Sequence, residues 1–82
     1  ITVGGDKAGT SVSFAGVDAA GAAINRTLSG VADGRLAAGS TEAVNGAQLH
    51  ATNEDVAANT AAITATVADV AANTTAITTA NT

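Results

Sequence analysis

The fold of this chain is decided by residues 49–77, which read LHATNEDVAANTAAITATVADVAANTTAI. The large apolar residues that recur at intervals of seven in this stretch are Leu49, Val56, Ile63, Val70 and Ile77. Apolar residues that recur once per heptad over five heptads are typical of a left-handed coiled coil. Residues 41–82 contain no proline, one glycine and many alanines, and alanine favours a helix more than any other residue. The sequence therefore predicts one helix over residues 41–82, about 60 Å long at the usual rise per residue.

The other half of the predicted core is polar. With the five large residues at position a, position d is occupied by Thr52, Asn59, Thr66, Asn73 and Ala80. A buried amide without a partner costs about 1–3 kcal/mol, which is comparable to the gain from burying one Val or Ile. Several helices around one axis offset this cost if the Asn59 and Asn73 amides point inward, because their N–H groups then converge on an axial water or anion. Either these Asn layers only fix register and oligomeric state, or they do so and also bind an axial species.

The predicted helix also contains an internal repeat. The phrase VAANTAAI at residues 56–63 returns as VAANTTAI at residues 70–77, an offset of 14 residues. Repetition over two heptads indicates a regular rod rather than a helix shaped to fit a globular core.

The first part of the chain has a different composition, and all nine glycines lie between Gly4 and Gly46. Residues 10–14 alternate polar with apolar side chains, which predicts a strand with Phe14 as a packing anchor. Residues 26–31 predict a second strand, residues 1–3 the end of an earlier one, and residues 4–7 a turn. The pattern of residues 15–27 predicts no particular path.

Composition favours an oligomer. Hydrophobic residues make up 46% of the 82, but 22 of them are Ala and only 16 are Val, Ile, Leu or Phe. There is one aromatic residue and no cysteine. Chains of about 80 residues or fewer rarely stabilise a core of their own without disulfides, metal or association. Association is the one of these that the composition leaves open.

Several function classes are disfavoured. Three basic residues and a net charge of −4 argue against binding nucleic acid. No apolar run reaches the roughly 18 residues of a membrane span, and no signal peptide is visible. His50 stands alone, without the second ligand that a metal site needs, and Glu54, Asp55 and Asp69 are expected on a solvated face. We expect neither catalysis nor a metal.

Two stretches resemble the neck of trimeric autotransporter adhesins, the surface fibres of Gram-negative bacteria. These are residues 26–34, RTLSGVADG, and residues 42–49, EAVNGAQL, with Glu42 where the family more often has Asp. The neck motif falls on Val31, Gly34, Val44, Asn45, Gln48 and Leu49. The two Val-Ala-Ala-Asn-Thr phrases are similar to those of the family's stalks. The resemblance extends from about Thr10 to the end of the chain.

The resemblance implies a mostly α fold with a small β part, in which short N-terminal strands and a neck lead into a left-handed coiled coil. Three parallel chains would intertwine as a homotrimer, each crossing to its neighbour in the neck. Residues 1–25 would be a β-rich connector or the end of a head, residues 26–48 the neck adaptor, and residues 49–82 the stalk. Asn59 and Asn73 would hold a halide, typically chloride, on the three-fold axis.

The function implied is structural. The segment would trimerise the fibre and space an adhesive head away from the outer membrane, at the bacterial cell surface. Anchoring would use a C-terminal region outside this sequence, and host surface or matrix components would bind other parts of the protein. The family's Asn-Ser-x-Ala-Ile-Gly head repeat is absent, so no adhesive specificity is carried over.

Two rival interpretations remain at this stage. A trimeric spacer from a phage or viral fibre would share the heptads but has no reason to carry the neck-like stretches. An ice-binding helix rich in Ala and Thr would align its threonines at an 11-residue repeat, whereas the repeat here is 14 residues long.

Overall fold

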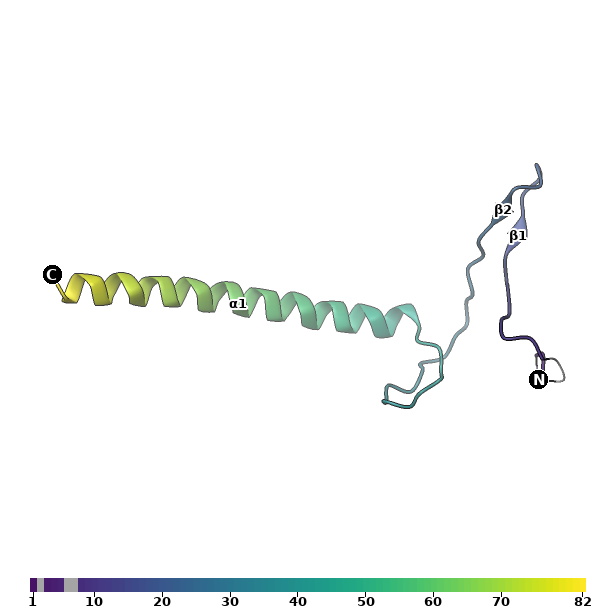
Figure 1. Cartoon of the computed structure of the whole chain (residues 1–82), viewed down its shortest axis with the longest axis horizontal. Coiled ribbons are helices and arrows are strands. Elements are labelled where there is room, and N and C mark those ends of the chain that lie inside the picture. The colour runs from purple at the N-terminus through teal and green to yellow at the C-terminus, as the bar shows by residue number, and fades with distance from the viewer. Residues whose placement is uncertain (2, 6–7) are drawn as a thin grey trace. The chain divides into compact units, whose positions relative to one another are not determined.

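The computed structural model describes residues 1, 3–5 and 8–82. Along the chain it contains strand β1 (Gly16–Val17), strand β2 (Ala23–Ile24) and helix α1 (Gly46–Ala80), which Figure 1 labels. The chain divides into two compact units, residues 1–30 and residues 31–82. The fold is thus mostly helical, with one small antiparallel sheet. The functional boundaries at 25/26 and 48/49 stay predictions.

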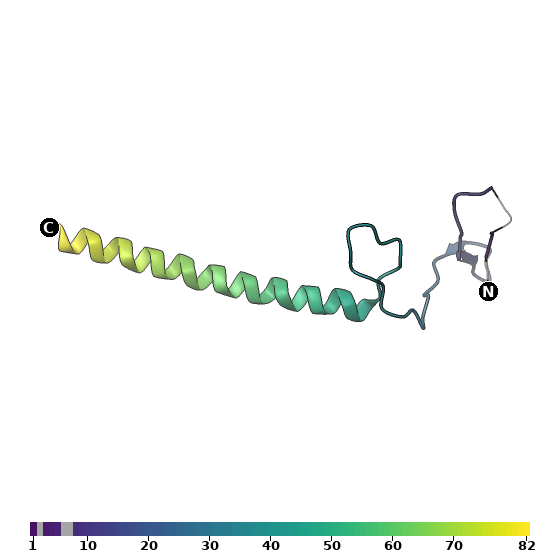
Figure 2. The same ribbon diagram turned by 90° about the horizontal axis from the view of Figure 1, so that it is seen from below.

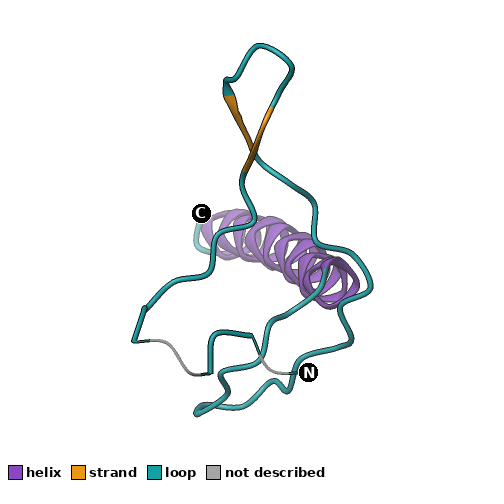
Figure 3. Ribbon diagram, turned by 90° about the vertical axis from the view of Figure 1, so that its right-hand side faces the viewer, coloured by secondary structure: helices purple, strands orange, loops and turns teal. Residues whose placement is uncertain are grey.

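The first unit is organised by a β-hairpin. Strands β1 and β2, orange in Figure 3, pair antiparallel with Gly16 opposite Ile24 and Val17 opposite Ala23. Asp18 closes the connecting turn, because its Oδ1 accepts hydrogen bonds from the backbone N–H groups of Ala20 at 2.8 Å and Ala22 at 2.9 Å. Gly21 completes the turn with a φ of 83°, which costs glycine little. Local turn chemistry therefore places the hairpin.

The two strands predicted at residues 10–14 and 26–31 are absent, and this prediction was wrong. Both stretches lack regular structure, and the paired residues fall inside the 15–27 segment to which no path was assigned. Alternation needs a second layer to bury its apolar face, yet Val12 and Phe14 are 59% and 57% exposed. The turn predicted at residues 4–7 is visible at Gly4, where φ is 71°. Its last two residues, Asp6 and Lys7, and Thr2 of the predicted first strand lie outside the described residues.

Helix α1 is one continuous helix of 35 residues, about 52 Å long (Figure 1). It begins five residues later than the predicted start at Thr41. The reason is Asn45, whose extended backbone (φ −93°, ψ 173°) and side chain form the N-cap. The helix ends at Ala80, with Asn81 as C-cap. The predicted helix is confirmed in kind and shortened at both ends.

The single chain has no hydrophobic core in the part that the structure describes. The five heptad residues Leu49, Val56, Ile63, Val70 and Ile77 are each between 56% and 64% exposed. A helix of this length gains most of its stability from packing an apolar stripe against another element. Among the residues that the structure describes, only Gly34 is buried.

Candidate functional site

The polar interactions of the second unit concentrate just before helix α1, at a group of five residues that we call the neck clasp: Val31, Asp33, Gly34, Asn45 and Gln48. The Gln48 side chain forms hydrogen bonds with both backbone groups of Gly34. Its Oε1 accepts from the Gly34 N–H at 2.9 Å, and its Nε2 donates to the Gly34 carbonyl at 2.7 Å. The same Oε1 also accepts from the backbone N–H of Asn45 at 3.1 Å. One side-chain amide therefore ties residue 34 to the first turn of the helix.

Asn45 supplies the second half of the clasp. Its Oδ1 accepts from the Gln48 N–H at 3.1 Å, so Asn45 and Gln48 form a reciprocal capping box. Its Nδ2 donates to the Val31 carbonyl at 2.9 Å and to Asp33 Oδ1 at 2.7 Å. The amide thus satisfies helix-end donors and loop acceptors at once. Together the two amides close a loop over residues 31–45, which Figure 2 shows leaving and returning to the start of α1.

Gly34 has no room for a side chain. A Cβ built there would overlap the Ala43 carbonyl oxygen and lie 2.9 Å from its carbonyl carbon. Both are backbone atoms, which cannot move without opening the loop. On the same loop the Glu42 carboxylate accepts from the Arg35 N–H, and Ser40 Oγ accepts from the Glu42 N–H at 3.2 Å. The glycine is required by close approach rather than by backbone angle.

Of the six residues assigned to the neck motif, the structure brings four together: Val31, Gly34, Asn45 and Gln48. Val44 and Leu49 are 52% and 58% exposed, and they stay available for contacts outside the single chain. Asp33 is a clasp member that the sequence reasoning missed. An available signal was the Asn-x-x-Gln spacing at residues 45–48, which has the form of a capping box. It would have placed the helix start but not the partner across the loop.

The stalk asparagines differ from the other polar residues of the predicted core. Thr52 and Thr66, at position d, donate their hydroxyl protons to the carbonyls of Gln48 at 3.3 Å and Ala62 at 2.9 Å. Within the described residues, neither Asn59 nor Asn73 makes a side-chain hydrogen bond. Their amides therefore keep both N–H groups free for partners outside the chain.

No cluster of side chains among the described residues has the composition of a reactive site. His50 Nε2 and Glu54 Oε1 are 2.9 Å apart, but their side chains are 74% and 69% exposed, and such pairs on a helix surface contribute little. No group of three His, Cys, Asp or Glu side chains is arranged to hold a metal among these residues. Over the same range, no helix has the length and hydropathy that a membrane crossing requires.

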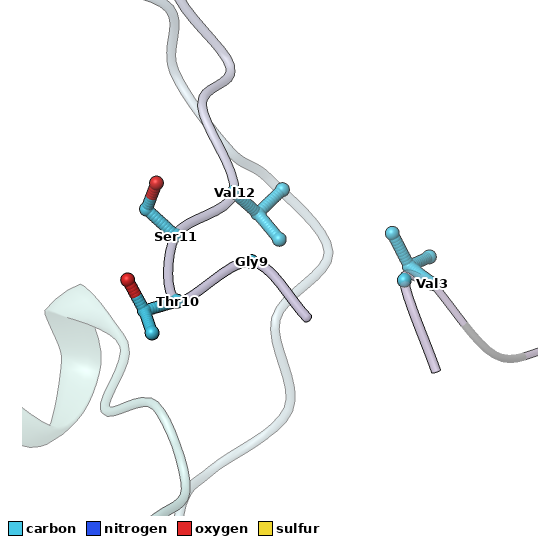
Figure 4. Close-up of a pocket in the computed structure, with 6 residues that line it drawn as sticks. Val3, Gly9, Thr10, Ser11 and Val12 are labelled. Atoms are coloured by element: carbon cyan, nitrogen blue, oxygen red, sulfur yellow. The ribbon is translucent and has the colours of Figure 1, made fainter. Parts of the chain in front are cut away.

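A hollow of about 400 Å³ lies in the first unit, where Val12 faces Val3 while the Thr10 and Ser11 hydroxyls point elsewhere (Figure 4). Its described lining is Val3, Gly4, Gly9, Thr10, Ser11 and Val12, none of which is titratable. This lining provides no acid, base or nucleophile pair for catalysis.

No family model and no solved structure matches this chain. The trimeric autotransporter adhesin AtaA of Acinetobacter sp. (strain Tol 5) is 45% identical to it over 56 residues, which are 68% of this chain. The chain belongs, as a stalk segment, to the trimeric autotransporter adhesins.

This adhesin segment corresponds to about 1% of the length of AtaA. Any stretch of 56 residues in a chain of 82 includes residues 27–56, so the similarity takes in the whole neck clasp and the start of the stalk. The predicted membership of this family is therefore confirmed.

Proposed function

We propose that this segment is the neck and upper stalk of a surface adhesin fibre, built from three parallel chains. The observation that carries the proposal is the exposed heptad seam of α1, five large residues with no core to pack against in the described chain. Three such seams facing one axis would bury every one of these residues. The similarity to AtaA supports three as the number of chains.

The stalk would act as a spacer. One α1 helix adds about 52 Å to the fibre, and its Asn and Thr layers keep the chains in register while Val, Ile and Leu layers hold them together. The neck would join a wider β-rich segment to this slim rod, with each chain crossing to a neighbour. The clasp supports this role because it fixes where each helix begins without help from another chain.

We propose further that the Asn59 and Asn73 layers each hold a chloride ion on the axis. Three amides per layer offer six N–H groups, and none of them is used within the described chain. Oriented N–H donors in a dry interior bind anions well, because the interaction is not shared with water. The ion would remove the cost of burying unpaired amides.

The segment itself would have no enzymatic activity and no contact with nucleic acid. We place the fibre at the bacterial cell surface, anchored in the outer membrane through a C-terminal region outside this sequence. Host surface or matrix components would be bound by other parts of the protein.

Energy transfer between labelled chains tests the parallel arrangement. One batch of the Thr82→Cys variant is labelled with the donor dye and another with the acceptor dye. The two batches are unfolded, mixed and refolded together. Parallel chains bring the labels together and give strong transfer. Antiparallel chains separate them by about the 52 Å of the helix, and weak transfer would rule the proposed stalk out.

A further inference from the structure

In the stalk, the type of residue at position e correlates with the type of residue at position d. The pairs at d and e are Thr52-Asn53, Asn59-Thr60, Thr66-Val67, Asn73-Thr74 and Ala80-Asn81. Threonine therefore stands at e only in the two heptads that have asparagine at d. Within the repeated phrase the residue after Thr changes, from Ala61 to Thr75, while the Asn-Thr pair is kept. This association calls for a physical reason.

The two threonines have the same local geometry. Thr60 Oγ1 donates to the Val56 carbonyl at 2.9 Å, and Thr74 Oγ1 donates to the Val70 carbonyl at 2.9 Å. Each hydroxyl proton is thereby committed to the carbonyl of the a residue that precedes it. The remaining lone pairs of Oγ1 accept hydrogen bonds. At position e, each threonine therefore presents a fixed acceptor.

In a parallel coiled coil, the side chain at d enters a hole formed by four residues of the facing helix. For Asn59 these are the a, d and e residues of the same heptad and the next a residue: Val56, Asn59, Thr60 and Ile63. Two are aliphatic, so Thr60 and the neighbouring Asn59 are the only polar side chains that the hole offers. The hole around Asn73 has the same composition, with Thr74 in the place of Thr60.

We propose that Thr60 and Thr74 are positioning residues for the asparagine layers. Each accepts, through Oγ1, one N–H of the asparagine amide from the adjacent chain. That bond holds the amide plane so that the second N–H points at the axis, where the anion of the proposed function would lie. The site is therefore incomplete in one chain, and the neighbouring copy contributes the residue that orients it. This inference rests on the trimeric stalk proposed above.

A competing arrangement is a closed ring in which each amide donates to Oδ1 of the next asparagine. The ring needs no threonine, so it predicts that removing the Thr60 hydroxyl has no effect on the layer. It also gives no reason for threonine to occupy position e only beside asparagine. The two arrangements are separable in a crystal.

The test uses crystals of the 82-residue chain, soaked over a range of bromide concentrations. The variants are Thr60→Val, which removes the hydroxyl at constant shape, and Thr60→Ser, which restores it. The matched control is Thr64→Val, because Thr64 donates to the Thr60 carbonyl at 3.0 Å in the same way but stands at position b, away from the axis. The Asn73 layer serves as an internal reference within each crystal.

We expect Asn59 Nδ2 of one chain to lie within hydrogen-bonding distance of Thr60 Oγ1 of the next. Bromide affinity at the Asn59 layer relative to the Asn73 layer should fall about tenfold in Thr60→Val, because each chain loses one hydrogen bond. Thr60→Ser should restore the ratio, and Thr64→Val should leave it unchanged.

An unchanged ratio in Thr60→Val, or an Asn59 amide that donates to the neighbouring Oδ1, overturns the positioning role and leaves the anion site standing. If the wild-type chain holds no bromide but shows the Asn59-to-Thr60 contact, the anion proposal fails and the positioning role stands. If neither ion nor contact is present, both are overturned.

Discussion

Gln48 replaces, for Gly34, the two backbone partners that a neighbouring strand would supply: its Oε1 accepts from the Gly34 N–H and its Nε2 donates to the Gly34 carbonyl. The two residues are 14 positions apart in the chain. Since Gln48 is also the third residue of α1 and a member of its capping box, the same side chain fixes the loop and the helix start. Both hydrogen bonds of this link lie within one chain.

Removing the Gln48 amide should destabilise both the loop at Gly34 and the start of α1. Gln48→Ala loses three side-chain hydrogen bonds and half of the capping box, so we expect the segment to be destabilised by about 2–3 kcal/mol. Thermal unfolding followed by circular dichroism measures this. Asn53→Ala removes an exposed amide of the same helix that makes no hydrogen bond within the described residues, and it should change the melting temperature little. Equal melting temperatures for the two variants would show that the clasp contributes nothing.

Gly34 and Gly39 give a matched pair of glycine substitutions. Gly34→Ala places a methyl group against the Ala43 carbonyl and should destabilise the neck by more than about 1 kcal/mol. Gly39→Ala meets no atom within 4 Å and should be neutral or slightly stabilising, because alanine restricts the unfolded chain. Chemical denaturation of both variants checks the order. A Gly34→Ala variant as stable as Gly39→Ala contradicts the close approach.

The hairpin of the first unit should depend on the Asp18 carboxylate. Asp18→Ala removes the acceptor of two backbone N–H groups, so the amides of Ala20 and Ala22 should exchange with solvent several-fold faster. Asp18→Asn keeps an Oδ1 acceptor and should protect them nearly as well. Hydrogen exchange measured by NMR distinguishes the variants. Fast exchange of both amides in the wild-type chain would be incompatible with the turn.

The polar layers should reduce the stability of the stalk. Replacing Asn59 with Ile turns an amide layer into an apolar one, and we expect the melting temperature to rise by about 5 °C or more. The dependence of the melting temperature on chloride concentration should weaken at the same time. Thr64→Ile changes an outward position and should raise the melting temperature much less. A lower melting temperature in Asn59→Ile would mean that the amide layer stabilises the stalk outright.

How far the sequence predicts this structure depends on the range of the interactions involved. The helix and its seam are visible in the spacing from Leu49 to Ile77, because a heptad is a local pattern. The helix start was predicted five residues early, since helix propensity rises gradually while Asn45 ends the loop abruptly through its cap. The capping residues are present in the sequence, but the predicted start at Thr41 followed the helix-favouring composition instead.

The clasp and the hairpin were harder to predict for different reasons. Asp33 contacts Asn45, and Gln48 contacts Gly34, across sequence separations of 12 and 14 residues. No periodic pattern in the sequence marks such contacts. At residues 10–14 the alternation was genuine, but pairing was decided by Asp18 and Gly21 in the following turn. A single chain also supplies no second layer for Phe14. We expect that layer, like the stalk core, to come from the proposed assembly of three chains.

Sedimentation equilibrium of the 82-residue chain tests whether three chains share one core, since one chain has a mass of 7.7 kDa. We expect a species of about 23 kDa, three times the chain mass, that dissociates and unfolds in one step. A folded, helical species of 7.7 kDa, or one of twice that mass, would contradict it.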